Sequence, residues 1–256
     1  MRLVLIAEDR VGFVTAKSLA DRVLIECGPD WINADSIEGL RDWTGLDETT
    51  PFTKWIELQR HPGFPHVKVH GKSEGLNYME AGRALTLAVL VAKDAPIDVV
   101  VLVRDLDNDP SRRQGLEKAR DVMATGLPFQ VIIAASDPEG EAWILHGFCV
   151  QTDAESDCLA SVQARLGFDP TRQHERLRGD RRRGGKQAAR DIKLVLSELI
   201  GPDPMREEIC LASTPLRVLI ERGRATGLAD FLAEVRARIL PLLDPAPPRP
   251  CDAWMD

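Results

Sequence analysis

The sequence has few aromatic residues, no closely spaced cysteine pair and no long apolar run. Aromatic side chains make up only 5% of the 256 residues, so a stacking surface for single-stranded nucleic acid would be sparse. The five cysteines form no Cys-x-x-Cys motif, and we interpret them as buried thiols in a reducing compartment. No segment approaches the length of a membrane span. We therefore expect a soluble, cytoplasmic protein without a membrane partner.

Several catalytic signatures are also missing. The chain has no Gly-x-Ser-x-Gly elbow, and its five histidines show no zinc spacing with the cysteines. The segment His70–Gly75 is too short for a phosphate-binding Walker loop. The net charge of −7 argues against a protein that coats nucleic acid through bulk positive charge. A local basic patch remains compatible with that total.

Apolar runs of strand length alternate with helical patterns in the first half of the chain. Strand-like runs, apolar apart from Asp98 and Gln130 at their first positions, occupy residues 3–7, 98–103 and 130–134, and a shorter strand is expected over 66–70. Between them, residues 11–25, 79–93 and 111–125 carry helical spacing. Continuous apolar strands separated by helices indicate a parallel sheet covered on both faces. We therefore predict an α/β fold: a mostly parallel four-stranded sheet flanked by helices.

The second part of the chain is predicted to be helical. Apolar residues recur at helical spacing over 192–200 and 228–242, and a proline-rich tail follows. The predicted organisation is an α/β domain over residues 1–150, with 28–65 as an insertion, and a helical region over 151–256. Two Asp-Pro steps, Asp109-Pro110 and Asp137-Pro138, each predict a helix whose N-cap is the aspartate.

Acidic residues follow the predicted strands. Glu8 comes directly after the first apolar run, and Asp105 and Asp107 follow the run at 98–103. Glu139 and Glu141 follow the last run. Parallel strands end at one edge of a sheet, so we expect these carboxylates to lie close together, where they would suit Mg²⁺ or Mn²⁺. Taken singly, Glu8 also fits a solvated loop, and Glu139 fits a first-turn residue that complements a helix dipole.

This pattern resembles the Toprim (topoisomerase–primase) catalytic domain. The matching residues are Leu3–Glu8, a strand that ends in Glu, and Val99–Asp107, a strand that ends in Asp-x-Asp. The segment Ser136–Phe148 is similar to the Glu-x-Trp stretch of RloB-like Toprim proteins, with Glu141 and Trp143 at the Glu and Trp positions. The resemblance covers roughly residues 1–150. It points to the RloB-like and OLD-type Toprim nucleases of phage-defence systems.

The resemblance implies a metal-dependent nuclease of DNA or RNA, acting in antiviral defence. Asp105 and Asp107 would hold the magnesium with help from Glu141, and Glu8 would bind a second metal or act as general acid or base. One alternative is a non-catalytic Toprim-like subunit that binds a partner ATPase or nucleic acid. A doubly wound phosphotransferase or phosphatase receiver is disfavoured, because the sequence shows no lysine after a later strand. The sequence leaves open whether the chain forms a homo-oligomer.

A basic segment supplies candidate contacts to nucleic acid. Residues 178–186 carry five basic side chains against one acidic side chain, with glycines on both sides. We expect this loop to contact phosphates by charge and to act apart from the acidic site. A solvated loop without a partner is the alternative. The candidate nucleic-acid-binding residues are Lys72, Arg178, Arg181, Arg182, Arg183 and Lys186.

Overall fold

The computed structural model describes residues 1–66, 77–179, 189–201, 203–244 and 251–254. Its strands are β1 (Arg2–Ala7), β2 (Asp42–Thr44), β3 (Thr53–Lys54), β4 (Val99–Asp105) and β5 (Gln130–Ser136). Its helices before residue 150 are α1 (Arg10–Cys27), α2 (Ile37–Leu40), α3 (Tyr78–Val91), α4 (Pro110–Met123) and α5 (Glu141–His146). The later helices are α6 (Asp153–Leu166), α7 (Ile192–Ile200), α8 (Pro204–Ser213), α9 (Leu216–Arg222), α10 (Leu228–Arg238) and α11 (Leu240–Leu243).

The sheet is parallel and has five strands. Four of them follow the order β2-β1-β4-β5, and β3 pairs with the far part of β1. The predicted α/β class is confirmed, and the strands predicted at 3–7, 98–103 and 130–134 are β1, β4 and β5. The prediction of four strands is wrong, because the segment 28–65 contributes β2 and β3 rather than looping out. Of the strand expected at 66–70, His66 ends a short 3-10 helix, and the remainder lies outside the described residues.

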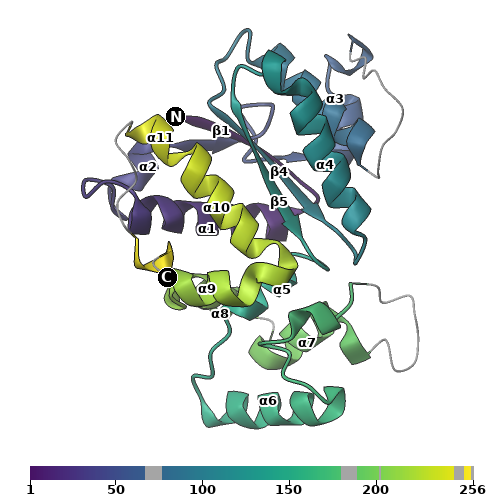
Figure 1. The fold of residues 1–256 in the computed structure, drawn as a ribbon, viewed down its shortest axis with the longest axis vertical. Helices are drawn as coiled ribbons and strands as arrows, with labels where there is room; N and C mark the ends of the chain where they lie inside the picture. The colour runs from purple at the N-terminus through teal and green to yellow at the C-terminus, as the bar shows by residue number, and fades with distance from the viewer. Residues whose placement is uncertain (67–76, 180–188, 202, 245–250, 255–256) are drawn as a thin grey trace.

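Both faces of the sheet are buried, which explains the unbroken apolar runs. Side chains at odd positions of β1, such as Leu3 and Leu5, join a cluster with α1, α5 and α10. Side chains at even positions, such as Val4 and Ile6, join a second cluster with α3 and α4. The three-layer arrangement is visible in Figure 1, where α1 and α10 lie on one side of β1, β4 and β5, and α3 and α4 on the other. Alternation therefore sorts residues between two cores instead of between core and solvent.

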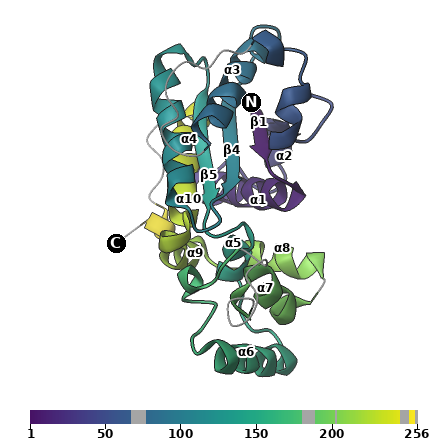
Figure 2. The ribbon, with the colours of Figure 1, turned by 90° about the vertical axis from the view of Figure 1, so that its right-hand side faces the viewer.

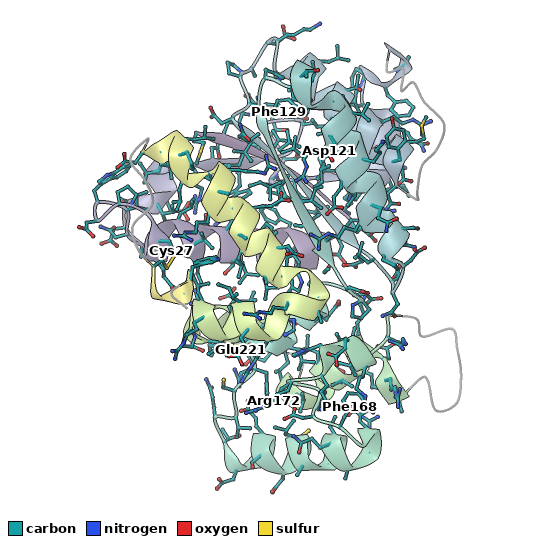
Figure 3. All side chains as sticks on the ribbon, in the orientation of Figure 1. Cys27, Asp121, Phe129, Phe168, Arg172 and Glu221 are labelled. Atoms are coloured by element: carbon teal, nitrogen blue, oxygen red, sulfur yellow. A yellow bond between two sulfur atoms is a disulfide. The ribbon has the colours of Figure 1, made fainter. Side chains whose placement is uncertain are left out.

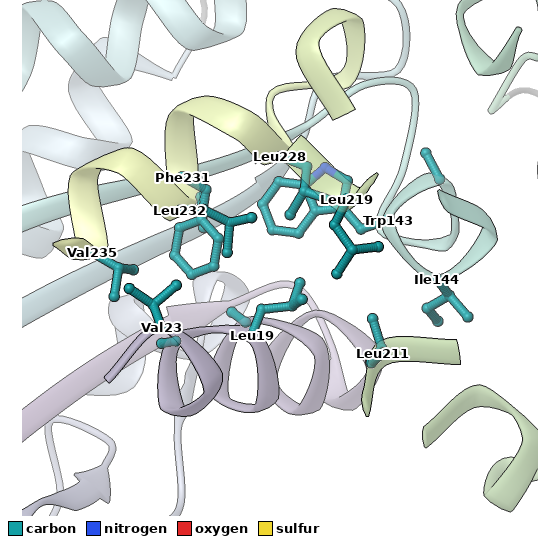
Figure 4. Packing of buried hydrophobic residues seen from close by; sticks show 14 of the residues in the cluster. Leu19, Val23, Trp143, Ile144, Leu211, Leu219, Leu228, Phe231, Leu232 and Val235 are labelled. Atoms are coloured by element: carbon teal, nitrogen blue, oxygen red, sulfur yellow. The ribbon is translucent and has the colours of Figure 1, made fainter. Parts of the chain in front are cut away.

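The helices after residue 151 divide between the sheet and a lobe beside it. Helix α10 packs on β5 and on α1, and Figure 4 shows Leu19 and Val23 of α1 facing the apolar side chains of α10. Trp143 of α5 stacks on Phe231 of α10, with ring centroids 5.2 Å apart. Its indole nitrogen donates to the carbonyl oxygen of Thr226 at 2.9 Å. Helices α6 and α7 form the lobe, next to α5 at the lower end of the sheet (Figure 2).

The two Asp-Pro steps have different structures. Asp109 is the N-cap of α4, as predicted, and its carboxylate accepts the backbone N–H of Ser111 at 3.0 Å. Asp137 is not an N-cap: α5 begins only at Glu141, after Gly140. The Asp137 carboxylate instead accepts the backbone N–H of Asn108 at 3.1 Å. The loop before α5 is thereby joined to the loop that follows β4.

The cysteines differ from the prediction of buried thiols. Cys27, at the end of α1, forms a disulfide with Cys251, close to the carboxyl end of the chain (Figure 3). Cys149, Cys158 and Cys210 are free, and only Cys210 is buried. Sequence spacing could not reveal a pair separated by 224 residues. Among the helices of the described residues, none is long and apolar enough to pass through a bilayer.

Candidate functional site

Asp105 is a partly buried carboxylate at the carboxyl edge of the sheet. It is the last residue of β4, and its Oδ1 accepts the Ser136 hydroxyl at 2.7 Å and the Gly140 backbone N–H at 2.9 Å. Burial raises the pKa of Asp105 to about 7, and repulsion from nearby glutamates adds to this rise, while the bond from Ser136 opposes it. The glutamates that repel it are Glu8, Glu141 and Glu139.

Glu8 lies at the same edge, directly after β1, which is the neighbour of β4. Its Oε1 is 3.0 Å from Nε of Arg104, and the same guanidinium reaches Glu80 of α3 at 3.2 Å. The Glu8 side chain is 38% exposed, so solvent reaches it. The next residue, Asp9, caps α1 by accepting the Gly12 N–H at 2.9 Å. Both acidic residues after β1 therefore act on the site: Glu8 raises the pKa of Asp105, and the capping residue Asp9 adds to the rise in the pKa of Glu141.

Asp107 occupies a left-handed turn beyond β4, with φ of 52°. Its backbone N–H donates to the carbonyl oxygen of Pro138 at 2.8 Å. Its side chain is 40% exposed and forms an ion pair with Arg112 of α4 at 2.5 Å. Asp107 is also near enough to raise the pKa of Glu139, where burial is the larger cause. Asp107 therefore belongs to the acidic edge, by which we mean the carboxyl edge of the sheet with Glu8, Asp105, Asp107, Glu139 and Glu141. Its side chain is more exposed to solvent than that of Asp105.

Glu139, just before α5, and Glu141, its first residue, are both close to one cation from the lobe, Lys193. Nζ of Lys193, on α7, lies 2.9 Å from Glu139 Oε2 and 3.7 Å from Glu141 Oε1. Burial raises the pKa of Glu141 to about 7; Lys193 opposes this rise, and Glu139 adds to it. Burial lowers the pKa of Lys193, but Glu141, Glu139 and Asp105 together raise it above its ordinary value. Lys193 is therefore an ammonium ion held beside these carboxylates.

The donor set fits Mg²⁺ or Mn²⁺ in chemistry. The side chains that gather here are carboxylates, the ligands that these hard cations prefer. No group of three or more potential ligands in the described part of the chain stands close enough to hold a metal ion as the side chains lie. The carboxylates are held by cations of the protein instead: Glu8 by Arg104, Asp107 by Arg112, and Glu139 by Lys193.

The described residues on both sides of positions 180–188 lie beside the acidic edge. Arg178 forms a parallel bridge with Asp191, so the two flanks of the segment are joined. A Cβ on Gly179 would come within 2.8 Å of Glu139 Oε1, which places the backbone at Gly179 directly against that glutamate. Arg178 also lowers the pKa of Asp137, opposing the effect of burial. These contacts bring the described flanks of the segment to the acidic group, while the expectation that the arginines at 181–183 act apart from it falls on residues outside the described ones. The other candidates, Lys72, Arg181, Arg182, Arg183 and Lys186, lie outside the described residues.

Four residues of the site were not singled out by the sequence. Arg104 stands inside the Asp-x-Asp strand, and Arg112 stands on the helix that follows it, so both could have been proposed as counter-ions. Ser136 ends β5, and the register pairs it with Asp105, a relation that only strand pairing reveals. No local sequence pattern marks Lys193 as a site residue, because basic residues are common on the exposed face of amphipathic helices.

Comparisons with protein families, with curated proteins and with solved structures found no match to this chain.

Proposed function

We propose that this chain is a metal-dependent phosphodiesterase of the Toprim type that cleaves DNA or RNA, with a role in antiviral defence. The observation that carries the proposal is the environment of Asp105. Its carboxylate is largely buried at the end of a central parallel strand, and three glutamates repel it. Charges of one sign are gathered at such cost mainly where a cation or a reaction requires them. The resemblance in Leu3–Glu8 and Val99–Asp107 supports the same reading.

Each carboxylate has a role in this proposal. Asp105, Asp107 and Glu141 would hold the metal, and Glu8 would exchange a proton at the scissile phosphate or help to hold a second ion. When bound, the metal would neutralise charge on the phosphate and make a water molecule more acidic. Glu8 and Asp107 are each more than one-third exposed, so a phosphodiester in solution can reach them. Asp105 already uses Oδ1 for Ser136 and Gly140, and hydrogen bonds among the described residues leave Oδ2 available.

The test is cleavage of plasmid, linear duplex and transfer RNA with Mg²⁺, Mn²⁺ or EDTA. We expect cleavage that requires metal and that Asp105→Asn lowers by at least about 100-fold, the scale on which metal-site and transition-state contacts act. The matched control is Asp121→Asn, the same change at an exposed position of α4. Cleavage that persists in EDTA, or that Asp105→Asn leaves unchanged, would refute the proposal. A non-catalytic subunit for a partner ATPase would show no cleavage of any substrate.

Lys193 favours a second candidate, a carboxylate that accepts a phosphoryl group. The sequence disfavoured this function because no lysine could be placed, yet Lys193 lies at the acidic edge, and the Ser136 hydroxyl bonds to Asp105. In this reaction an oxygen of Asp105 would bond to phosphorus while the bond from phosphorus to the donor's oxygen breaks, releasing the donor's carboxylate. Incubation with acetyl phosphate and Mg²⁺ should then increase the mass of the protein by one phosphoryl group. An unchanged mass would exclude acetyl phosphate as a donor and count against this candidate.

A further inference from the structure

Lys193 is fixed in place by the way in which α7 begins. The carboxylate of Asp191 caps the helix by accepting the backbone N–H of Leu194 at 3.0 Å. The N–H of Ile192 donates to the carbonyl oxygen of Arg178 at 3.0 Å, so the first turn is joined to a neighbouring segment. Ile192 and Val195 are fully buried in the core that α5 shares. Lys193, between them, therefore projects from a rigid turn.

The partners of Lys193 are more buried than Lys193 itself. The side chains of Glu139 and Glu141 are 8% and 15% exposed, whereas that of Lys193 is 37% exposed. The ammonium group thus meets the two carboxylates from the solvent side. A charge interaction with groups as enclosed as these is screened less by water and salt than one between surface residues.

We infer that Lys193 is the internal counter-cation of the site and competes with the divalent metal for Glu141, the proposed metal ligand that it faces together with Glu139. This inference rests on the proposed function, because it takes the metal to bind at the acidic edge. The ammonium lies 3.7 Å from Oε1 of Glu141 and is held there by Glu139 at 2.9 Å, so a metal ion at Glu141 must share that carboxylate with it. A metal ion must also approach against the positive charge of the ammonium. Lys193 would therefore set the metal concentration at which the site fills.

The test measures metal binding without nucleic acid, by titrating the full chain with Mn²⁺ and recording free Mn²⁺ by electron paramagnetic resonance. Lys193→Met replaces lysine with an unbranched apolar side chain of similar length and so removes only the charged ammonium group. We expect the variant to bind Mn²⁺ at least about tenfold more tightly, given the size of a charge interaction over a few ångströms. Lys193→Arg keeps the charge and should bind as the unchanged protein does. The matched control is Lys93→Met, which removes the same charge just after α3 and before β4 begins, at the opposite edge of the sheet.

The outcomes separate this inference from the proposed function. If Asp105→Asn abolishes Mn²⁺ binding but Lys193→Met leaves it unchanged or weakens it, the competition is refuted and the metal site stands. If neither the unchanged protein nor Lys193→Met binds Mn²⁺, both proposals fall. Binding that appears only in Lys193→Met would support the competition strongly. Circular dichroism checks the fold, and if Lys193→Met does not fold, Lys193→Gln provides the same measurement.

Discussion

Replacing Asp105 with asparagine should stabilise the metal-free protein at about pH 8, and the gain should disappear in acid. Asparagine removes the charge but keeps an oxygen that can accept from Ser136 and Gly140, the donors that Asp105 uses. The change therefore tests the cost of the buried charge and leaves the hydrogen bonds in place. It also asks whether the carboxylate is kept for the fold or for a function.

The magnitude follows from the pKa of Asp105, which is about 7 in the folded protein against an ordinary value of 3.8. The folded state holds this proton more tightly than the unfolded state does, so the free energy of unfolding falls as the pH rises between these two values. Below the lower value both states are protonated, and above the higher value the loss is complete. A difference of about three pKa units corresponds to about 4 kcal/mol, which is the upper limit for the gain from Asp105→Asn.

The assay is urea unfolding followed by circular dichroism, with EDTA present, at about pH 8 and about pH 4. We expect Asp105→Asn to raise the free energy of unfolding by about 2–4 kcal/mol at the higher pH and by about zero at the lower pH. Asp107→Asn is the control: its side chain is 40% exposed and paired with Arg112, so the change should cost less than about 1 kcal/mol. A destabilised Asp105→Asn at the higher pH, or an equal gain at both pH values, would refute the reasoning.

Three further predictions concern Asp107, the basic segment and the edge strand β5. Asp107→Ala should abolish metal-dependent cleavage while the circular dichroism spectrum stays unchanged, and activity that survives would remove Asp107 from the site. Replacing the arginines at 181–183 should flatten the slope of log affinity against log salt by up to about three units in a nucleic-acid binding titration; an unchanged slope would identify a solvated loop. Glu234 accepts the N–H of Ile133 on the edge strand β5 at 3.0 Å and pairs with Arg120 at 2.7 Å. Glu234→Ala should therefore lower the free energy of unfolding by about 1–3 kcal/mol in urea, and a loss under 0.5 kcal/mol would contradict that role.

The strands that the sequence predicted are the ones buried on both faces. In β1, β4 and β5 every second residue faces one core and the rest face the other, so the run of apolar residues is continuous and easy to recognise. Strands β2 and β3 have only three and two residues, too few to show any periodicity. They exist because β1 offers a free edge for pairing, and that edge is a property of the assembled sheet.

The two Asp-Pro steps show how the same local signal can lead to different structures. At Asp109 the chain leaves β4, has room to turn, and continues into a helix that the aspartate caps. At Asp137 the chain leaves β5 beside the turn after β4, where the Asn108 N–H needs an acceptor. The backbone N–H of Asp137 donates to the carbonyl oxygen of Thr226, from a segment far along the chain. The helix is delayed until Glu141, because long-range partners use the groups that would otherwise have started it.

The acidic residues of the site could be found in the sequence because each lies at the end of a strand or within a few residues after it, and parallel strands bring their ends together. Their cations could not be found in the same way. Lys193 lies on a helix that meets α5 only through the packing of the lobe, and nothing near Lys193 in the sequence marks it as different from a surface lysine. A carboxylate cluster can thus be read from local sequence, whereas its net charge depends on the tertiary fold. Under the proposed function, that net charge would decide how strongly the site attracts a metal ion, so the metal affinity would depend on a residue that the sequence motif does not contain.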